Sequence, residues 1–258
     1  MKPPPFELLL ATSVAEAVEV LAADDGAKVL AGGQSLVPLL ALRLARPTVL
    51  VDVNGLDLDG IAVVDGEVRL GALVRHRHLE RQTAVPLLAQ AARLIGHPAI
   101  RHRGTLGGSL AHADPVAELP AALLALGGSV VVEGPGGRRT IRADQLFEGF
   151  LTTSIGPDEL LVEVRVPAPG PSTRSAFCEW APRMGDFAVV GIALVVDDTS
   201  ARAVACGIDT RPLDVSDAFE PGLPADEVAA RVRARCAGDV DKAQLAGVLA
   251  MRALREVA

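Results

Sequence analysis

The stretch VLAGGQSL, residues 29–36, decides the fold, because it places two adjacent glycines between an apolar strand pattern and an apolar helix pattern. We expect a short buried strand over residues 28–31 and a helix from about residue 35 to residue 44. Adjacent glycines let the backbone bend sharply and approach a ligand without interference from a Cβ atom. Their amides, the Ser35 hydroxyl and the start of the following helix suit a pyrophosphate. The motif is neither GxGxxG nor a P-loop with its lysine, and taken alone it fits a plain strand-to-helix turn equally well.

A second glycine pair lies in IRHRGTLGGSLAHADP, residues 100–115. Thr105 and Ser109 flank these glycines, and their hydroxyls suit phosphate oxygens. Asp114 follows just before a proline, where its carboxylate can accept hydrogen bonds from ribose or ribityl hydroxyls. The alternative is a surface loop with an Asx turn at Asp114. A bland loop rarely needs so many small residues, so a binding function is favoured here.

The remaining patterns point to mixed helix and strand in two parts. Ser13 to Glu16 is a capping box that opens a helix, and Asp65-Gly66 is a hairpin signal. The proline-rich segment 167–171 is the best linker candidate, so we expect a larger α+β domain before it and a smaller one after it. We expect strands at 48–52, 61–64, 68–71, 129–133, 138–142, 160–166, 175–180, 189–196 and 201–206, and helices near 87–94, 120–126, 226–236 and 241–255.

Composition narrows the class of protein. The chain has 258 residues, half of them hydrophobic, and a net charge of -7, which argues against nucleic-acid binding. Its three cysteines form no CxxC or Cys/His cluster, so we expect no iron–sulfur or zinc site and no metal ligands. No apolar run approaches the roughly 20 residues that span a bilayer, and the N-terminus lacks a signal-peptide core. We therefore expect a soluble, cytoplasmic protein. The chain has no tyrosine, so a catalytic tyrosine is excluded.

Two residue types have alternative interpretations. His76 and His78 stand at an expected helix start, but no third ligand lies near them in the sequence, so exposed or loop-capping histidines are favoured over a metal site or covalent flavin attachment. Cys178 is interpreted as a small buried side chain in preference to a reactive thiol.

The two glycine motifs together, AGGQS and RxRGTLGGSxxxADP, resemble the FAD-binding medium subunit of the molybdenum hydroxylases. That family includes carbon monoxide dehydrogenase and the flavin domain of xanthine dehydrogenase. Segments 51–56, 70–73, 159–162 and 183–188 also follow the order of the family, so the resemblance covers nearly the whole chain.

The resemblance implies a fold and a binding site. The fold class would be α+β, with a vanillyl-alcohol-oxidase (PCMH)-type FAD-binding domain at 1–170, built of subdomains at about 1–54 and 55–170. A small α+β C-terminal domain of the carbon monoxide dehydrogenase flavoprotein type would follow at 171–258. Both motifs would wrap the pyrophosphate, Asp114 would bind a sugar-like hydroxyl, and two apolar residues would lie near the isoalloxazine ring. The implied FAD-binding residues are Val29, Leu30, Ala31, Gly32, Gly33, Gln34, Ser35, Leu36, Ile95, Thr105, Gly107, Gly108, Ser109, Asp114 and Leu161, of which Ile95 and Leu161 are the two near the ring.

The resemblance also implies partners and an electron-relay role without catalytic residues in this chain. A molybdenum-cofactor large subunit would oxidise the substrate, and a [2Fe-2S] small subunit would pass electrons to FAD in a dimer of heterotrimers. The acceptor, whether NAD+, a quinone, oxygen or another molecule, and the substrate of the complex stay open. Cys178 stands where some relatives have a lysine that reaches the flavin. The alternatives are a stand-alone flavin-dependent oxidase or dehydrogenase and a scaffold that has lost FAD.

Overall fold

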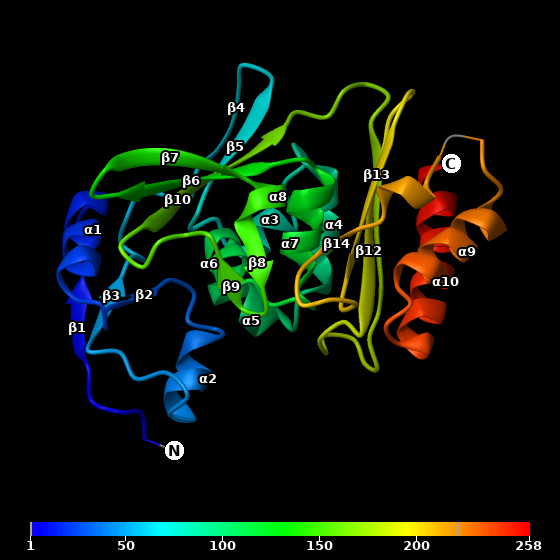
Figure 1. Cartoon of the computed structure of the whole chain (residues 1–258). Coiled ribbons are helices and arrows are strands. Elements are labelled where there is room, and N and C mark those ends of the chain that lie inside the picture. Colours follow the sequence, from blue (N-terminus) through cyan, green and yellow to red (C-terminus); the bar gives the residue numbers. More distant parts are fainter. Residues whose placement is uncertain (1, 221) are drawn as a thin grey trace.

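The structure is a computed structural model that describes residues 2–220 and 222–258. It is built in successive layers, which run in Figure 1 from the blue N-terminal elements on one side to the red C-terminal helices on the other. Three sheets and the helices between them carry the three hydrophobic cores. The α+β fold class expected from the sequence is confirmed.

The first layer is a three-stranded parallel sheet in the order β1-β3-β2. It contains β1 (Glu7–Leu10), α1 (Val14–Ala23), β2 (Lys28–Leu30), α2 (Leu36–Ala41) and β3 (Val49–Asp52). The sequence prediction missed β1, because this strand shows no alternation between apolar and polar residues and is mostly exposed. The helix expected over 35–44 is shorter at both ends, and Arg43, just after it, has a left-handed φ of 59°.

Helix α1 packs between this small sheet and the larger sheet beside it. Its N-cap is Ser13, whose Oγ accepts from the Glu16 amide at 3.1 Å, while the Glu16 carboxylate reaches back to the Thr12 amide at 2.7 Å. Val18 and Leu21 on its buried face join the core that also contains Val131 and Val162 of the larger sheet. The first two layers therefore share one core.

The larger sheet has five antiparallel strands in the order β4-β5-β10-β6-β7. The predicted hairpin is present, with Asp65 at φ 53° and Gly66 at φ 78°, as a type I′ turn requires. A β-bulge between Leu161 and Glu163 shifts the register of β10, so Leu161 faces the helices while Leu160 and Val162 face α1. The strands are β4 (Ile61–Val64), β5 (Glu67–Gly71), β6 (Ser129–Gly134), β7 (Gly137–Arg142) and β10 (Leu160–Pro167).

Helices cover the other face of this sheet. One of the segments that form them was expected to be a loop. The glycine-rich segment 100–115, expected as a loop, is largely helical. Thr105 caps a helix there by accepting the Gly108 amide at 3.1 Å, which offsets the weak helix propensity of the two glycines. The elements are α3 (His76–Leu79), α4 (Pro86–Leu94), α5 (Pro98–Arg103), α6 (Leu106–His112), α7 (Glu118–Ala125) and α8 (Ala143–Leu146), followed by a small hairpin of β8 (Phe147–Gly149) and β9 (Thr152–Thr153).

The C-terminal part is a four-stranded antiparallel sheet in the order β11-β12-β13-β14, with helices behind it. One face, including Phe177 and Val204, packs on α4 and α7, and the other face, including Cys178 and Ile192, packs on α9 and α10. The elements are β11 (Arg174–Trp180), β12 (Val190–Val196), β13 (Ala201–Cys206), β14 (Leu213–Asp214), the 3-10 helix η1 (Ser216–Ala218), α9 (Ala225–Arg235) and α10 (Val240–Val257). In the described residues, no helix combines the length and the apolar character needed to cross a membrane.

Candidate functional site

The fold brings the two glycine motifs side by side. A Cβ atom placed on Gly32 would lie 2.8 Å from the Cα of Gly104 and closer still to the Arg103 carbonyl oxygen. A Cβ atom placed on Gly108 would lie 3.7 Å from the Cβ of Ala31. The first motif therefore needs glycine for its backbone to touch the second, and the two form one continuous site.

The first motif presents backbone amides that are free for a ligand. Gly33 has φ +74°, which glycine adopts without strain, and this conformation turns the chain from β2 into α2. Across residues 2–220 and 222–258, no protein group accepts from the amides of residues 32–35. Within the same ranges the Ser35 hydroxyl caps nothing, and Gln34 donates its side-chain amide to the Gly32 carbonyl at 3.2 Å. Amides gathered in this way are suited to bind an anion.

The amides of the second motif are already used inside the protein. Leu106 donates to the Val74 carbonyl at 2.9 Å and Gly107 to the Ala72 carbonyl at 2.8 Å, while Thr105 accepts the Gly108 amide. A Cβ atom placed on Gly107 would lie 2.7 Å from the Cβ of Ala72, so this glycine is needed for close packing. The Ser109 hydroxyl, which is half-buried and bonds no other described residue, is one polar group that the second motif offers a ligand.

A small apolar hollow opens where the motifs meet. Five of the expected FAD-binding residues line it: Val29, Ala31, Gly107, Gly108 and Leu161. Residues that follow β3 and β5, and residues before and at the start of β10, complete the wall, among them Val53, Leu73 and Ile155. Leu161 reaches this position because the bulge in β10 turns it toward the helices.

The other ten expected residues are not part of this lining, Asp114 and Ile95 among them. Asp114 accepts the Val116 amide at 3.1 Å, which is the Asx turn that the sequence allowed, and its second carboxylate oxygen is left for another donor. Ile95 follows α4, is partly buried against the central core, and has its carbonyl held by Arg101 at 3.0 Å. Cys178 is buried beneath α10 in the C-terminal core, as the small-side-chain interpretation predicted, and burial raises the pKa of its thiol to about 12.

The sequence analysis missed the residues that connect the two motifs. Asn54 and Arg75 hydrogen bond to each other and to the backbone of both motifs. His76, expected to be exposed or loop-capping, is 5% exposed and does cap a loop, with its Nε2 2.9 Å from the Thr105 carbonyl oxygen. Burial lowers the pKa of His76 to about 4, so its ring is neutral at pH 7. Asn54 lies in segment 51–56, which follows the family order, and this was the available signal.

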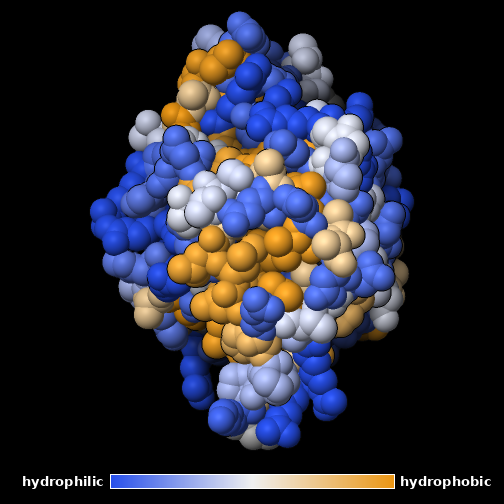
Figure 2. All heavy atoms as spheres, turned by 90° about the vertical axis from the view of Figure 1, so that its left-hand side faces the viewer, coloured by the Kyte–Doolittle hydropathy of each residue, from blue (hydrophilic) through white to orange (hydrophobic). Residues whose placement is uncertain are grey.

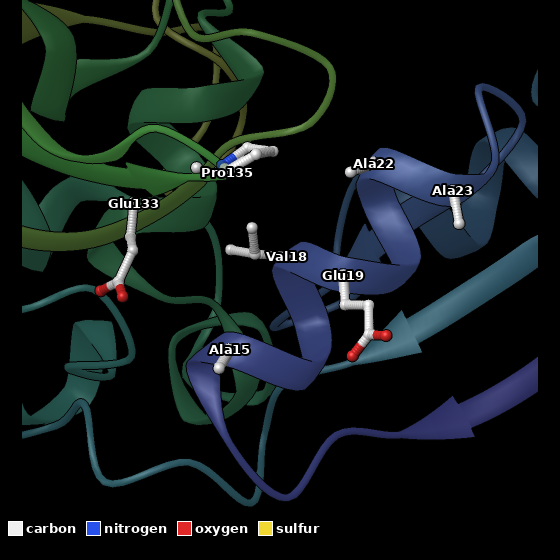
Figure 3. A pocket seen from close by; sticks show the side chains of 8 residues that line it. Ala15, Val18, Glu19, Ala22, Ala23, Glu133 and Pro135 are labelled. Carbon is white, nitrogen blue, oxygen red and sulfur yellow. The ribbon is translucent and has the colours of Figure 1, made fainter.

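The other groove on the surface is less suited to a phosphate ligand than the hollow between the two motifs. A shallow groove runs between α1 and the turn that joins β6 and β7, with Ala15, Val18 and Ala22 on one side and Pro135 on the other (Figure 3). Its charged lining residues, Glu19 and Glu133, would repel a phosphate. Among residues 2–220 and 222–258, no group of three or more His, Cys, Asp or Glu side chains gathers as a metal site.

Known proteins are similar to this chain in sequence. The family model described as "FAD binding domain in molybdopterin dehydrogenase" matches residues 4–169. The alpha subunit of the 6-hydroxypseudooxynicotine dehydrogenase complex of Paenarthrobacter nicotinovorans is 46% identical over 202 residues, 76% of this chain and 68% of that protein. The medium chain of carbon monoxide dehydrogenase from Hydrogenophaga pseudoflava is 42% identical over 202 residues, 76% of this chain and 70% of that protein.

Solved structures superpose on this chain over its whole length. A chain of carbon monoxide dehydrogenase from Hydrogenophaga pseudoflava superposes with a TM-score of 0.94 at 35% identity, covering all of this chain and 98% of that chain. A chain of quinoline 2-oxidoreductase from Pseudomonas putida 86 superposes with a TM-score of 0.91 at 31% identity, again covering all of this chain and 98% of that chain.

The protein is a flavoprotein component of an oxidoreductase, and its free loop amides suit the pyrophosphate of a dinucleotide cofactor. The chain belongs to the family of FAD-binding domains of molybdopterin dehydrogenases, as a medium subunit of the molybdenum hydroxylase type with FAD as its cofactor.

Proposed function

We propose that the chain relays electrons from the [2Fe-2S] clusters of a partner subunit, through FAD, to an external acceptor. The observation that carries this proposal is the joined pair of glycine motifs, which leaves four consecutive amides free beside a small hollow. FAD supplies the redox chemistry, since it can exchange one or two electrons when bound. The chain itself contributes binding, orientation and the electrostatic surroundings of the flavin.

We assign the FAD contacts as follows. The amides of residues 32–35, with the Ser35 and Ser109 hydroxyls, hold the pyrophosphate, because no other described residue accepts from these amides or bonds these hydroxyls. Asp114 accepts a sugar-like hydroxyl through the oxygen that its Asx turn leaves over. Ile95 and Leu161 lie near the isoalloxazine ring and shield it from water. The remaining residues of the 29–36 stretch and Thr105, Gly107 and Gly108 shape the backbone around the cofactor.

We infer that the partners are a molybdenum-cofactor large subunit and a [2Fe-2S] small subunit, assembled as a dimer of heterotrimers in the cytoplasm. The medium chains of carbon monoxide dehydrogenases support this assembly by analogy. The surface supports it as well, because the side of the molecule that carries β1 shows a broad apolar area (Figure 2). Leu8 and Leu10 on β1 are 53% and 64% exposed, and large apolar areas of this kind mark contact sites.

We further propose domain boundaries at residues 1–170 and 171–258, with subdomains at about 1–54 and 55–170. Each unit has its own sheet, and the connecting segment 167–171 is mostly exposed. The cores are shared, however, because the five-stranded sheet packs on α1 and the C-terminal sheet packs on α4 and α7. The units therefore pack against one another through shared cores.

The alternative of a stand-alone flavin oxidase requires a base near the hollow. Glu159 is the one titratable residue among the residues that line the hollow, and Arg139 holds both of its carboxylate oxygens at 2.6 Å. That hydrogen-bonded pair lowers the pKa of Glu159, so its carboxylate is a weak base. This observation favours the electron relay over independent substrate oxidation.

The test is electron transfer from a separately purified [2Fe-2S] subunit to this chain. The FAD-loaded chain is mixed without oxygen with the [2Fe-2S] partner subunit, previously reduced with dithionite and freed of excess reductant. We expect the oxidised-flavin absorbance to fall while the oxidised-cluster absorbance returns, with two cluster electrons used for each FAD. Unchanged flavin and cluster bands over minutes would contradict the relay. Turnover of an organic substrate by the FAD-loaded chain alone would favour the oxidase.

A further inference from the structure

The Asn54 side chain hydrogen bonds to the backbone of the first glycine motif. Its Nδ2 donates to the Ala31 carbonyl at 2.8 Å and to the Leu30 carbonyl at 3.3 Å. Asp52 fixes the orientation of this amide group, because Asp52 Oδ1 accepts from the same Nδ2 at 2.5 Å and from the Asn54 backbone amide at 2.9 Å. The end of β2 is thereby tied to the end of β3, just before the free amides of residues 32–35.

The Arg75 guanidinium continues the connection to the second motif. One terminal nitrogen donates to Asn54 Oδ1 at 2.7 Å, and the other donates to the Arg103 carbonyl oxygen at 2.5 Å. The next residue, His76, donates its backbone amide to the Gly104 carbonyl at 3.0 Å and places its ring against the Thr105 carbonyl. Three consecutive carbonyls of the second motif, from Arg103 to Thr105, are therefore held by two adjacent residues.

This connection depends on the planar shape of the arginine guanidinium. A guanidinium presents several N–H donors in a fixed fork, so one side chain can bridge two acceptors whose separation is then set. Lysine has a single ammonium on a flexible stem and cannot impose the same separation. Arg75 and its hydrogen bond to Asn54 are partly buried, which strengthens that bond relative to a fully hydrated pair.

We propose that Asn54 and Arg75 are positioning residues that clamp the two glycine motifs at the spacing that the FAD pyrophosphate requires. This inference rests on the proposed cofactor contacts and adds residues that do not themselves need to touch FAD. The clamp fixes the free amides before the ligand arrives, so less ordering is required on binding and the affinity rises. The Arg75 guanidinium also carries positive charge between the two motifs, partly balanced by Asp52 and Asp59.

The test is a double-mutant cycle on FAD affinity. We expect Asn54→Ala and Arg75→Met each to raise the Kd for FAD about 10-fold or more, since each removes two or more hydrogen bonds from the clamp. Because both residues act through the same connection, the double variant should lose little more than the weaker-binding single variant. Arg75→Lys, which keeps the charge, should still weaken FAD binding several-fold. Arg138→Met, which breaks an exposed ion pair on β7, is the matched control and should bind FAD like the unmodified chain.

Two further readouts separate positioning from general damage. The melting temperature of the FAD-free variants should change too little to explain the loss of affinity. The phosphorus NMR signals of bound FAD should shift in Arg75→Lys, because the amides around the pyrophosphate move. Additive losses in the cycle, or an Arg75→Lys variant with unchanged affinity and unchanged phosphorus signals, would overturn the clamp. Failure of the unmodified chain to bind FAD at all would instead contradict the proposed cofactor contacts.

Discussion

Replacing Gly32 by valine should weaken FAD binding at least about 100-fold, which is the largest effect we expect from a single substitution. Even the first carbon of the new side chain would lie 2.8 Å from Gly104 Cα and against the Arg103 carbonyl. Those atoms belong to the backbone, so the conflict cannot be relieved by a change of rotamer. The two motifs must separate, and the free amides of the first would leave the hollow lined by Ala31 and Gly108.

The measurement is the quenching of FAD fluorescence during titration of the purified variant. The control is Gly136→Val, because no atom outside its immediate chain neighbours lies within 4 Å of a Cβ atom at that position, which is far along the chain from both motifs. The control should keep the affinity of the unmodified chain. A Gly32→Val variant that folds and binds FAD with that same affinity would show that the contact between the two motifs is not needed for the cofactor.

The second large effect is a loss of stability as the pH rises from about 6 to 9. Glu118, on the face of α7 that meets the C-terminal sheet, is 7% exposed. Burial, then the negative charges of Glu179 and Asp114, raise the pKa of Glu118 to about 8. Burial also raises the pKa of Glu179, on β11, to about 7. The thiol of Cys206 on β13 faces both carboxyl groups, and burial raises its pKa as well.

The direction of this pH dependence follows from the number of protons that the folded and the unfolded state bind. Both glutamates have a higher pKa in the folded chain than in the unfolded chain, so between about pH 4.5 and pH 8 the folded state binds more protons. Stability therefore falls with rising pH across this window and levels off above it. For Glu118 alone the loss over the whole window is of the order of 5 kcal/mol, at about 1.4 kcal/mol for each unit of pKa shift, and about 3 kcal/mol of it falls between pH 6 and pH 9.

Urea unfolding at pH 6 and pH 9 measures this loss directly. Glu118→Gln keeps the shape of the side chain and cannot ionise, so the difference in unfolding free energy between the two pH values should shrink by several kcal/mol. Glu227→Gln, at an exposed position of α9, is the control and should keep the full pH dependence. An equal pH dependence in the unmodified chain and in Glu118→Gln would mean that Glu118 is ionised in the folded state near neutral pH.

Much of the fold was predictable because local patterns agree with the tertiary structure. The Asp65-Gly66 turn, the Ser13 cap and the apolar strands of the central and C-terminal sheets carry their own signals. The Gly32-Gly33 turn was likewise predicted, since a left-handed residue between a strand and a helix selects glycine.

What escaped prediction depends on contacts between distant segments. Strand β1 forms by parallel pairing with β3, and such pairing leaves no turn signal in the sequence. Helix α6 contains two glycines and forms because residues 72 and 74 accept its first amides. Asn54 and Arg75 meet only through the fold, so no local spacing identifies them as partners. Such connections lie between the motifs and are found from the structure alone.

The most direct test of the central claim is a crystal structure of the chain with FAD bound. The account predicts the pyrophosphate within hydrogen-bond distance of the amides of residues 32–35 and of the Ser109 hydroxyl, with the ring toward Leu161. Asn54 and Arg75 should keep their present hydrogen bonds to both motifs. A pyrophosphate bound elsewhere, such as in the groove beside α1, with those four amides facing only water, would contradict the account.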